Sequence, residues 1–424
     1  MAKIDDSVKK KVPELRFPGF TDDWEERKFF ESIASTIDFR GRTPKKLGMD
    51  WSDSGYLALS ALNVKNGYID PLADAHYGDE KLYRKWMSGR ELKKGQVLFT
   101  TEAPMGNVAQ VPDDNGYILS QRTVAFETKE DMMTNDFLAV LLKSPLVFNN
   151  LSALSSGGTA KGVSQKSLKG LSITVPLDID EQQKIGSFFK QLDNTIALHQ
   201  RKLDLLKEQK KGYLQKMFPK NGARVPELRF AGFADDWEQR KLGDISYKVK
   251  EKNKTGEFTE TLTNSAEYGI INQRDFFDKD ISNAKNLTGY YVVKNDDFVY
   301  NPRISNFAPV GPIKRNKLGR TGVMSPLYYV FRTHDIDKNY FEKYFDTVYW
   351  HRFMELNGDS GARADRFAIK DSVFVEMPIP YPTMDEQQKI GSFFKQLDDT
   401  IALHQCKLDL LKEQKKGFLQ KMFV

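Results

Sequence analysis

Cysteine is almost absent from this chain of 424 residues, because Cys406 is the only one. A single thiol excludes an intrachain disulfide and a zinc ribbon, and it is typical of proteins from a reducing cytoplasm. The longest apolar run, Phe137–Leu142, ends at Lys143 and is far shorter than the roughly 20 residues of a membrane helix. The first residues lack the apolar core and cleavage site of a signal peptide. We therefore expect a cytoplasmic protein with no membrane contact.

Catalytic and nucleotide-binding motifs are missing as well. The sequence contains neither a Gly-x-x-x-x-Gly-Lys-Ser/Thr phosphate loop nor a dinucleotide-type glycine fingerprint. Asn301–Ile304 comes nearest to the Asn/Asp-Pro-Pro-Tyr/Phe motif of amino-methyltransferases, but it lacks the second proline and the aromatic residue. His76, His334 and His351 do not have metal-ligand spacing. These absences predict a recognition protein without its own active site, metal or cofactor.

The charge balance is mildly basic. Lys and Arg number 64 and Asp and Glu 58, which gives a formal net charge of +6. This excess is compatible with binding to nucleic acid but does not require it. Aromatic residues make up 12% of the chain, so we expect substantial hydrophobic cores.

The most informative feature of the sequence is a double internal repeat. Residues 180–218 and 385–423 differ only at Asn194/Asp399, Arg201/Cys406 and Tyr213/Phe418. A shorter block at 12–29 returns at 225–242 with four differences. Between these blocks lie two segments with little similarity to each other. Two variable segments in one fixed frame predict a molecule that performs the same kind of task twice, on two targets.

Each long repeat is predicted to form a helix, with Asp180 as its N-cap and Gln183 completing a capping box. Apolar side chains recur with 3–4 spacing over five heptads, which is a coiled-coil pattern. His199 and His404 also fall in the seam, where we expect satisfied histidines rather than metal ligands. The predicted helix-pairing residues are Ile185, Phe189, Leu192, Ile196, Leu203, Leu206, Ile390, Phe394, Leu397, Ile401, Leu408 and Leu411.

Such a helix serves either dimerisation or pairing within the chain. The duplication favours pairing within the chain, because both partners are already linked covalently and lose less entropy on pairing. Pseudo-twofold symmetry then makes the pair antiparallel. Further apolar residues widen the seam and are candidates to contact the globular domains or another protein: Phe188, Leu198, Leu205, Leu214 and Phe218.

The two variable segments share a pattern despite their different sequences. Helix candidates at Asn135–Leu154 and Asn339–Gly358 each precede a Ser-Gly loop. Strand candidates follow at Leu171–Val175 and Val373–Met377. Short Val/Ile/Tyr/Phe runs divided by Gly, Asn and Asp turns indicate sheet. Each variable domain is therefore predicted to be α+β, with its basic residues concentrated in loops.

The frame resembles the DNA-specificity subunit of type I restriction-modification enzymes. The resemblance covers essentially the whole chain and rests on four features: Pro13–Trp24 with its repeat Pro226–Trp237, the Gly41-Arg42-Thr43-Pro44 element, the Ser-Gly loops, and Asp-Glu-Gln-Gln-Lys-Ile before each long helix. The second domain lacks a clear Gly-x-Thr-Pro element.

The resemblance implies a first DNA target-recognition domain at 1–178, a spacer helix at 179–219, a second recognition domain at 220–384 and a second spacer helix at 385–424. The helices would set the distance between two DNA half-sites. The expected partners are double-stranded DNA with a split site, two modification subunits and two restriction subunits. S-adenosylmethionine, ATP and Mg²⁺ would be bound by those partner subunits, so this chain would be non-catalytic and supply specificity alone, directing adenine methylation and ATP-dependent cleavage.

Basic and polar residues in the loops are the candidate DNA contacts, because arginine can grip guanine edges and lysine positions itself on phosphate. The candidates are Arg42, Thr43, Arg122, Lys161, Lys166, Arg303, Asn306, Arg363, Arg366 and Lys370. Two other readings stay open: a stand-alone DNA-binding adaptor or regulator with the same frame, and a structural coiled-coil protein with two protein-binding domains. Salt-sensitive DNA binding would exclude the structural reading.

Overall fold

The computed structural model describes residues 12–155, 162–220, 222–276, 284–360 and 365–424. It forms two compact units, Met1–Arg201 with Cys406–Val424, and Lys202–Gln405. Each unit therefore contains one variable domain, the first part of the helix that follows it and the last part of the other long helix.

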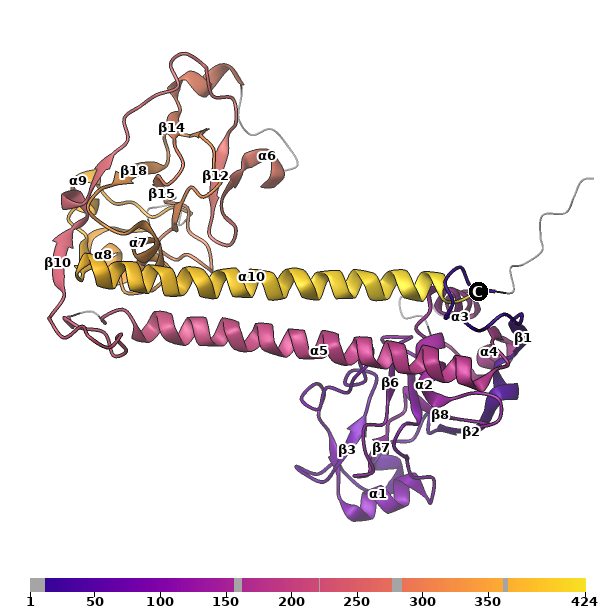
Figure 1. The fold of residues 1–424 in the computed structure, drawn as a ribbon. Coiled ribbons are helices and arrows are strands. Elements are labelled where there is room, and N and C mark those ends of the chain that lie inside the picture. The colour runs from indigo at the N-terminus through magenta and orange to yellow at the C-terminus, as the bar shows by residue number, and fades with distance from the viewer. Residues whose placement is uncertain (1–11, 156–161, 221, 277–283, 361–364) are drawn as a thin grey trace, which may run out of the picture. The chain divides into compact units, whose positions relative to one another are not determined.

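The first unit alternates short strands and helices (Figure 1). Its elements are β1 Glu25–Lys28, β2 Ile33–Asp38, β3 Tyr56–Leu59, β4 Tyr77–Gly78, α1 Glu80–Met87, β5 Val97–Thr100, β6 Val108–Gln110, β7 Ile118–Leu119, β8 Thr123–Thr128, α2 Asn135–Leu141, α3 Pro145–Leu154, α4 Gln165–Gly170, β9 Ser172–Val175 and the start of α5 Ile179–Lys216.

A four-stranded antiparallel sheet in the order β2-β8-β5-β6 is the centre of the first unit. All four residues of β5 are buried, as expected for a central strand covered on both faces. β3 runs parallel to β7 and antiparallel to β4 in a second, three-stranded sheet. β1 pairs with β9, so that the beginning and the end of the domain lie side by side.

The second unit repeats this plan. Its elements are β10 Glu238–Lys241, β11 Ser246–Lys248, β12 Leu262–Ser265, β13 Gly269–Asn272, α6 Gln273–Phe276, β14 Tyr291–Val293, β15 Phe298–Tyr300, β16 Ile313–Arg315, β17 Gly322–Met324, β18 Tyr329–Thr333, α7 Lys338–Phe345, α8 His351–Asn357, α9 Asp371–Phe374, β19 Pro378–Tyr381 and the start of α10 Met384–Lys421.

The sheet order β11-β18-β15-β16 in the second unit matches β2-β8-β5-β6 in the first. β10 pairs with β19 as β1 does with β9, while β12 pairs with β13 and β14 with β17. The prediction of two α+β domains, each followed by a long helix, is confirmed.

Two details of the predicted pattern are wrong. The single helix expected at each of Asn135–Leu154 and Asn339–Gly358 is a pair, α2 with α3 and α7 with α8. In the first unit the break falls where Ser144 caps a new helix with Pro145 in its first turn. The strand expected at Val373–Met377 is instead the short helix α9, and the strand follows it as β19. An apolar run of this length fits either structure, so periodicity did not distinguish them.

The short repeated block is explained by an ion pair with the long helix. Arg16 donates two hydrogen bonds to the fully buried carboxylate of Glu181, at 2.7 and 2.8 Å. Arg229 and Glu386 form the same pair at the same distances in the second unit. A buried carboxylate is costly unless it is paired, so the arginine of one block and the glutamate of the other depend on each other.

The glutamine after that glutamate binds each helix to its own domain. Gln182 accepts a hydrogen bond from the Thr134 backbone and donates to the carbonyls of Met132 and Pro176. The prediction that Asp180 is the N-cap is wrong. Asp178 accepts hydrogen bonds from the backbone of residues 180 and 181, because the helix begins at Ile179, two residues earlier than an N-cap at Asp180 would place its first residue.

The long helices pair antiparallel within each unit. In the first unit, Phe188 near the start of α5 packs edge-on against Phe418 near the end of α10, with ring centroids 5.1 Å apart. In the second unit the roles are exchanged, and Tyr213 meets Phe393 at 5.0 Å. The intramolecular pairing predicted from the duplication is therefore confirmed.

The residues of the predicted seam are buried to different degrees. Eight of its residues are buried, namely Ile185, Phe189, Leu203, Leu206, Ile390, Phe394, Leu408 and Leu411. The other four, Leu192, Ile196, Leu397 and Ile401, are only partly buried, as are both seam histidines. Ile185 and Phe189 pack into the core of the first unit, and Ile390 and Phe394 into the core of the second.

None of the described helices is both long and apolar enough to cross a bilayer alone, and α2 and α3 reach such a length and apolar content only together, as a pair bent by 69°. The buried residues of α2 belong to the core of the first unit.

Each long helix ends inside the core of the domain that the other long helix follows. Phe423, after α10, packs against Trp24, Phe137 and Phe189, with ring centroids 6.0 to 6.2 Å apart. Phe218, after α5, lies 5.4 Å from the ring of Tyr340 in the second unit. Since each core is completed by residues from the other half of the sequence, neither half folds around its own residues alone.

We expect Phe423→Ala to destabilise the first unit by about 3–5 kcal/mol, the usual cost of removing a buried Phe side chain. Phe218→Ala is the matched variant and should act on the second unit. Hydrogen exchange resolved by peptide measures the two units separately. Each variant should accelerate exchange mainly in the domain of the opposite half of the sequence, and faster exchange confined to its own half would contradict this account.

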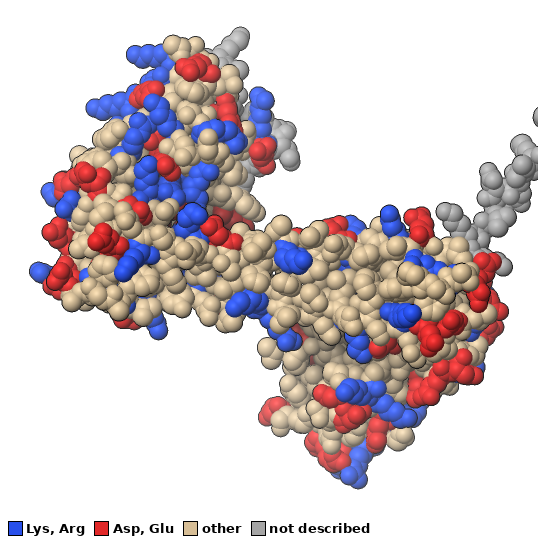
Figure 2. Space-filling model, in the orientation of Figure 1, with Lys and Arg blue, Asp and Glu red and all other residues tan. Residues whose placement is uncertain are grey.

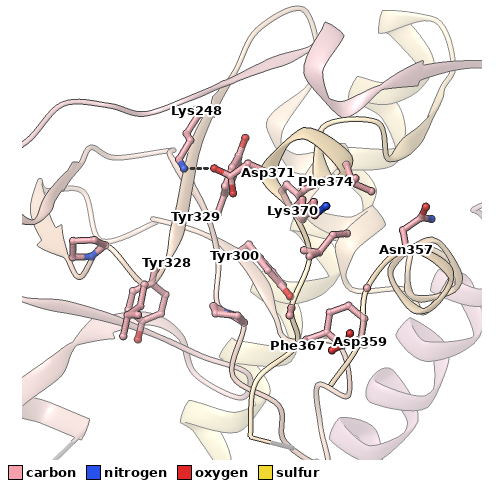
Figure 3. Close-up of a pocket in the computed structure, with 17 residues that line it drawn as sticks. Lys248, Tyr300, Tyr328, Tyr329, Asn357, Asp359, Phe367, Lys370, Asp371 and Phe374 are labelled. Atoms are coloured by element: carbon pink, nitrogen blue, oxygen red, sulfur yellow. Dashed lines mark hydrogen bonds and ion pairs between the residues drawn. The ribbon is translucent and has the colours of Figure 1, made fainter. Parts of the chain in front are cut away.

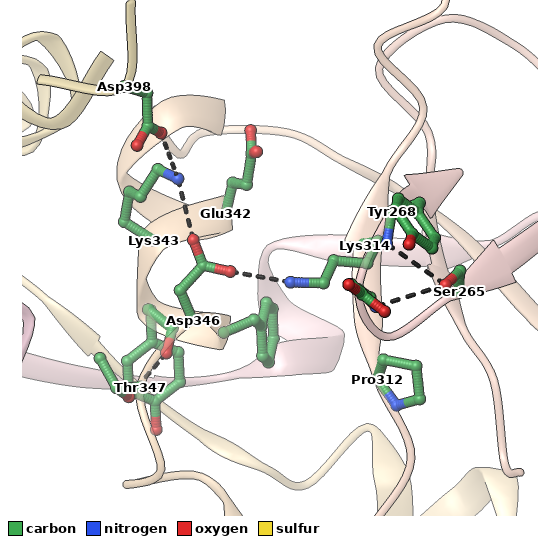
Figure 4. A network of polar contacts seen from close by, with 12 residues as sticks. Ser265, Tyr268, Pro312, Lys314, Glu342, Lys343, Asp346, Thr347 and Asp398 are labelled. Atoms are coloured by element: carbon green, nitrogen blue, oxygen red, sulfur yellow. Dashed lines mark hydrogen bonds and ion pairs between the residues drawn. The ribbon is translucent and has the colours of Figure 1, made fainter. Parts of the chain in front are cut away.

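An aspartate in each long helix holds three parts of a unit together. Figure 4 shows the contact of Asp398 with Lys343 in the second unit, and the chain of pairs that continues through Asp346 to Lys314. Asp398 accepts from Lys343 of α7 at 2.8 Å and from Lys210 of α5 at 2.6 Å. Lys343 also reaches Asp346, which in turn binds Lys314 at 2.9 Å. The corresponding Asp193 pairs with Lys143 of its domain and with Lys415 of α10.

Burial alone would raise the pKa of Asp398, but the charges and hydrogen bonds of Lys343 and Lys210 together outweigh burial and hold that pKa below its ordinary value. A carboxyl with a lowered pKa in the fold contributes stability above its unfolded pKa, near about 4, and loses that contribution as the pH falls further. We expect Asp398→Asn to destabilise the second unit by about 1–3 kcal/mol at pH 7, and by less below about pH 4.

Asp399→Asn is the matched control. Asp399 is exposed, pairs only with Lys395 on its own helix, and is replaced by Asn194 in the other copy. Its substitution should change the unfolding free energy by less than about 0.5 kcal/mol, measured by urea denaturation at pH 7 and pH 3.5. Equal effects of the two variants would show that the junction does not stabilise the unit.

Candidate DNA-recognition surface

The candidate surface of the first unit forms where two loops join. The backbone N–H of Val163, just after the Ser-Gly loop, donates to the carbonyl of Thr101, just after β5, at 2.9 Å. Next to this bond, Glu102 and Gly162 face each other in an isolated antiparallel bridge. Because the backbone is hydrogen-bonded here, Gly162 and Val163 are held against the loop after β5.

Two arginines are anchored beside this bridge. The carbonyl of Arg122 accepts from the backbone and the hydroxyl of Thr101, at 2.9 and 3.2 Å, while the Arg122 side chain is exposed. Arg40 donates to the carbonyl of Val163 at 3.1 Å and pairs with Asp38 at 2.9 Å. The first unit thus holds Arg40 against Val163 and an exposed Arg122 next to Thr101, where both arginines are candidates to contact phosphate.

The second unit joins the same two loops in the same way. The backbone N–H of Phe367 donates to the carbonyl of Pro302 at 2.7 Å, and Arg303 bridges to Arg366. A further hydrogen bond joins Ile304 to Asp365 at 3.0 Å. Both arginines are exposed, so two predicted DNA contacts that are 63 positions apart in sequence lie together.

The loop of the second unit is longer and ends in an exposed aromatic residue. Ser305 and Ala308 close a tight turn that carries Asn306 and Phe307 at its tip. The Phe307 side chain is 82% exposed, which is unusual for a phenylalanine. A cleft at the turn is lined by Arg303, Arg366 and Phe307 among others, and the buried side-chain oxygen of Asn264 in its wall has no hydrogen-bond partner among the described residues.

Predicted residues after the Ser-Gly loops take up equivalent positions in the two units. Lys166 lies in the first turn of α4, and Lys370 immediately precedes α9. Figure 3 shows Lys370 beside Asp371 and Phe374 at the edge of a cavity that also contains Tyr300 and Phe367. Both lysines are exposed and lie near the joined loops in sequence.

Arg42 and Thr43 have local structural contacts. Arg42 packs over the Phe39 ring, with its guanidinium carbon 4.3 Å from the centroid, and donates to the carbonyl of Trp86. Burial, with a smaller contribution from Arg90, lowers the pKa of the Arg42 guanidinium. The Thr43 hydroxyl accepts from the backbone of Lys46 and so stabilises the following turn.

The predicted residues are thus distributed unevenly. Arg122 in the first unit, and Arg303, Asn306 and Arg366 in the second, lie at or beside the joined loops. Lys161 and Arg363 lie outside the described residues. Glu102 in the first unit and Phe307 in the second also belong to the candidate surfaces of their units but were not predicted. Nothing in the sequence indicates that an acidic residue or an exposed aromatic residue should face outwards there.

The surface charge is mixed. Figure 2 shows Lys and Arg interspersed with Asp and Glu on the visible face of each unit, rather than one continuous basic field. Among the described residues, no group of three or more His, Cys, Asp or Glu side chains is arranged to hold a metal ion. What the geometry offers is a pair of fixed loops with exposed polar and basic groups, which suits recognition of an anionic polymer.

The fold and these surfaces define a protein with two recognition domains carried on paired helices. The family model described as "Type I restriction modification DNA specificity domain" matches twice, over residues 22–208 and 234–413. The chain therefore belongs to the type I restriction-modification DNA specificity family, whose task is sequence-specific DNA recognition.

Curated relatives carry the same designation. The chain is 24% identical to a protein named as the type I restriction enzyme MjaX specificity subunit of Methanocaldococcus jannaschii, over 94% of this chain and 92% of that one. It is 22% identical to the MjaVIII specificity subunit of the same organism, over 71% and 72%. The fold is similar to the crystal structure of the S subunit of a type I system from M. genitalium, with a TM-score of 0.61, 15% identity and coverage of 97% and 99%.

We expect Arg42→Ala and Arg122→Ala to act differently. Arg42→Ala should lower the melting temperature of the first unit, because it removes a hydrogen bond and a cation–π contact together worth about 1–2 kcal/mol. Arg122→Ala should leave the melting temperature unchanged but weaken DNA binding and reduce the slope of log K against log salt by about 1. Calorimetry measures the melting temperature, and anisotropy titrations over a KCl series measure the DNA affinity and its salt dependence. A stability loss in Arg122→Ala together with a pure DNA-binding loss in Arg42→Ala would contradict these assignments.

Proposed function

We propose that this chain is the specificity subunit of a type I restriction-modification complex and reads a bipartite DNA site. Each unit recognises one half-site, and the bases between the half-sites are not read. The observation that carries the proposal is the double family match, one match for each variable domain with its helix. A single recognition domain would bind one contiguous site.

The chain itself supplies specificity and performs no catalysis. Two modification subunits that bind S-adenosylmethionine methylate adenine within the site, and two restriction subunits that use ATP and Mg²⁺ cleave the DNA. The helices provide a docking surface, since Leu198 and Leu403 occupy corresponding positions in the two copies and are 67% and 69% exposed. Exposed leucines at repeated positions suit two copies of one partner.

The length of the helices is proposed to set the gap between the half-sites. Each helix has 38 residues, which corresponds to a length of about 57 Å at 1.5 Å per residue. This length is compatible with half-site centres about one turn of DNA apart.

We expect a split adenine-methylation motif to appear only in cells that contain both this chain and an active modification partner. Genome-wide mapping of methylated adenine, with and without the chain, is the measurement. Exchanging the two variable domains should exchange the two half-sites. A contiguous motif, or no motif with the partner shown to be active, would contradict the proposal.

Binding assays separate this function from a stand-alone adaptor or regulator. A specificity subunit should reach full affinity for the mapped site only with its modification partner bound. Tight and specific binding by the chain alone, with no methylation change, would favour the adaptor.

A further inference from the structure

The joined loops contain one position at which the two units differ in charge although the backbone is the same. In each unit, a carbonyl after the central strand accepts the N–H of a residue after the Ser-Gly loop: Thr101 from Val163, and Pro302 from Phe367. The residue after that carbonyl is Glu102 in the first unit and Arg303 in the second.

The residue opposite changes in parallel. Glu102 bridges to Gly162, and Arg303 bridges to Arg366. A Cβ placed on Gly162 would lie 3.5 Å from the Glu102 side chain, so the glutamate lies directly against the glycine. One unit therefore presents a single carboxylate at this point and the other presents two guanidinium groups.

A carboxylate has no favourable partner in a phosphate backbone. In the major groove it can accept a hydrogen bond from the amino group of cytosine, whereas the guanidinium of arginine matches the two acceptors of guanine. The flanking Arg40 and Arg122 in the first unit supply the cations that phosphate contact requires. This leaves Glu102 free to read a base without making the whole surface repulsive.

The backbone at Glu102 and at Arg303 is fixed in a way that favours contact with a base. The backbone on either side of each bridge is hydrogen-bonded, so less entropy is lost when the side chain is fixed against DNA. Glu102 is partly exposed and Arg303 is exposed. No hydrogen bond or ion pair of either side chain is found with the rest of the described chain.

We propose that Glu102 and Arg303 are equivalent base-selecting residues, Glu102 for cytosine in one half-site and Arg303 for guanine in the other. The inference rests on the proposed function and extends it to single residues. The two half-sites then differ at this position because a negative side chain in one unit is replaced by a positive side chain in the other, on the same backbone.

Glu102→Gln and Arg303→Gln test the assignment in the complete complex with its modification partner. Glutamine pairs with adenine, so each variant should change one base of one half-site and leave the other half-site intact. Relative methylation, and oligonucleotide competition at fixed salt, should show preference for the original base reduced by about 10- to 100-fold. Glu102→Asp should retain the preference for cytosine.

Glu130→Gln is the control, because Glu130 is an exposed acid beyond the opposite end of β8. It should leave both half-sites unchanged. If the wild-type chain directs a split motif but Glu102→Gln and Arg303→Gln leave it unaltered, or weaken all sites uniformly, the assignment is overturned and the proposed function stands. If the wild-type chain directs no split motif, the proposed function itself fails.

Discussion

The docking of each helix end into a distant domain is the constraint on which the rest of the structure depends. Phe423 is the penultimate residue of the chain, and it packs against Trp24 near the start. Phe218 fills the corresponding place in the second unit. Because both cores are completed by an aromatic residue from elsewhere in the sequence, the end of each long helix lies against the start of the other, and the helices pair antiparallel within each unit.

The contacts that hold the repeated frame are therefore distinct from the contacts that hold the variable loops. The frame residues Arg16, Glu181 and Gln182 are satisfied by each other and by the backbone, so exchanging a loop does not disturb them. The loops after β5 and β15 contact the Ser-Gly segments through backbone hydrogen bonds, which are indifferent to the side chains present. A glutamate and an arginine can consequently occupy the same position of one fold.

Much of the architecture could be predicted from the sequence. The repeats indicated two units and paired helices, and alternating apolar runs indicated α+β domains. The errors came from short segments. Helix α9 was taken for a strand because four apolar residues fit either state, and Asp180 was chosen as N-cap although Asp178, two residues earlier, fulfils that role. Local patterns do not decide such cases, because the surrounding packing contributes more energy than propensity does.

By itself, the sequence determined the duplication, the heptad seam, the division into frame and variable segments, and the lack of known catalytic motifs. These are properties of residue order and spacing, and they need no knowledge of long-range contacts. Only the tertiary structure decided that Arg303 lies beside Arg366, that Glu102 occupies the corresponding place, and that Arg42 turns towards its own domain. Such juxtapositions arise from loop closure across more than forty residues, and the contacts that fix them leave no trace in the local sequence.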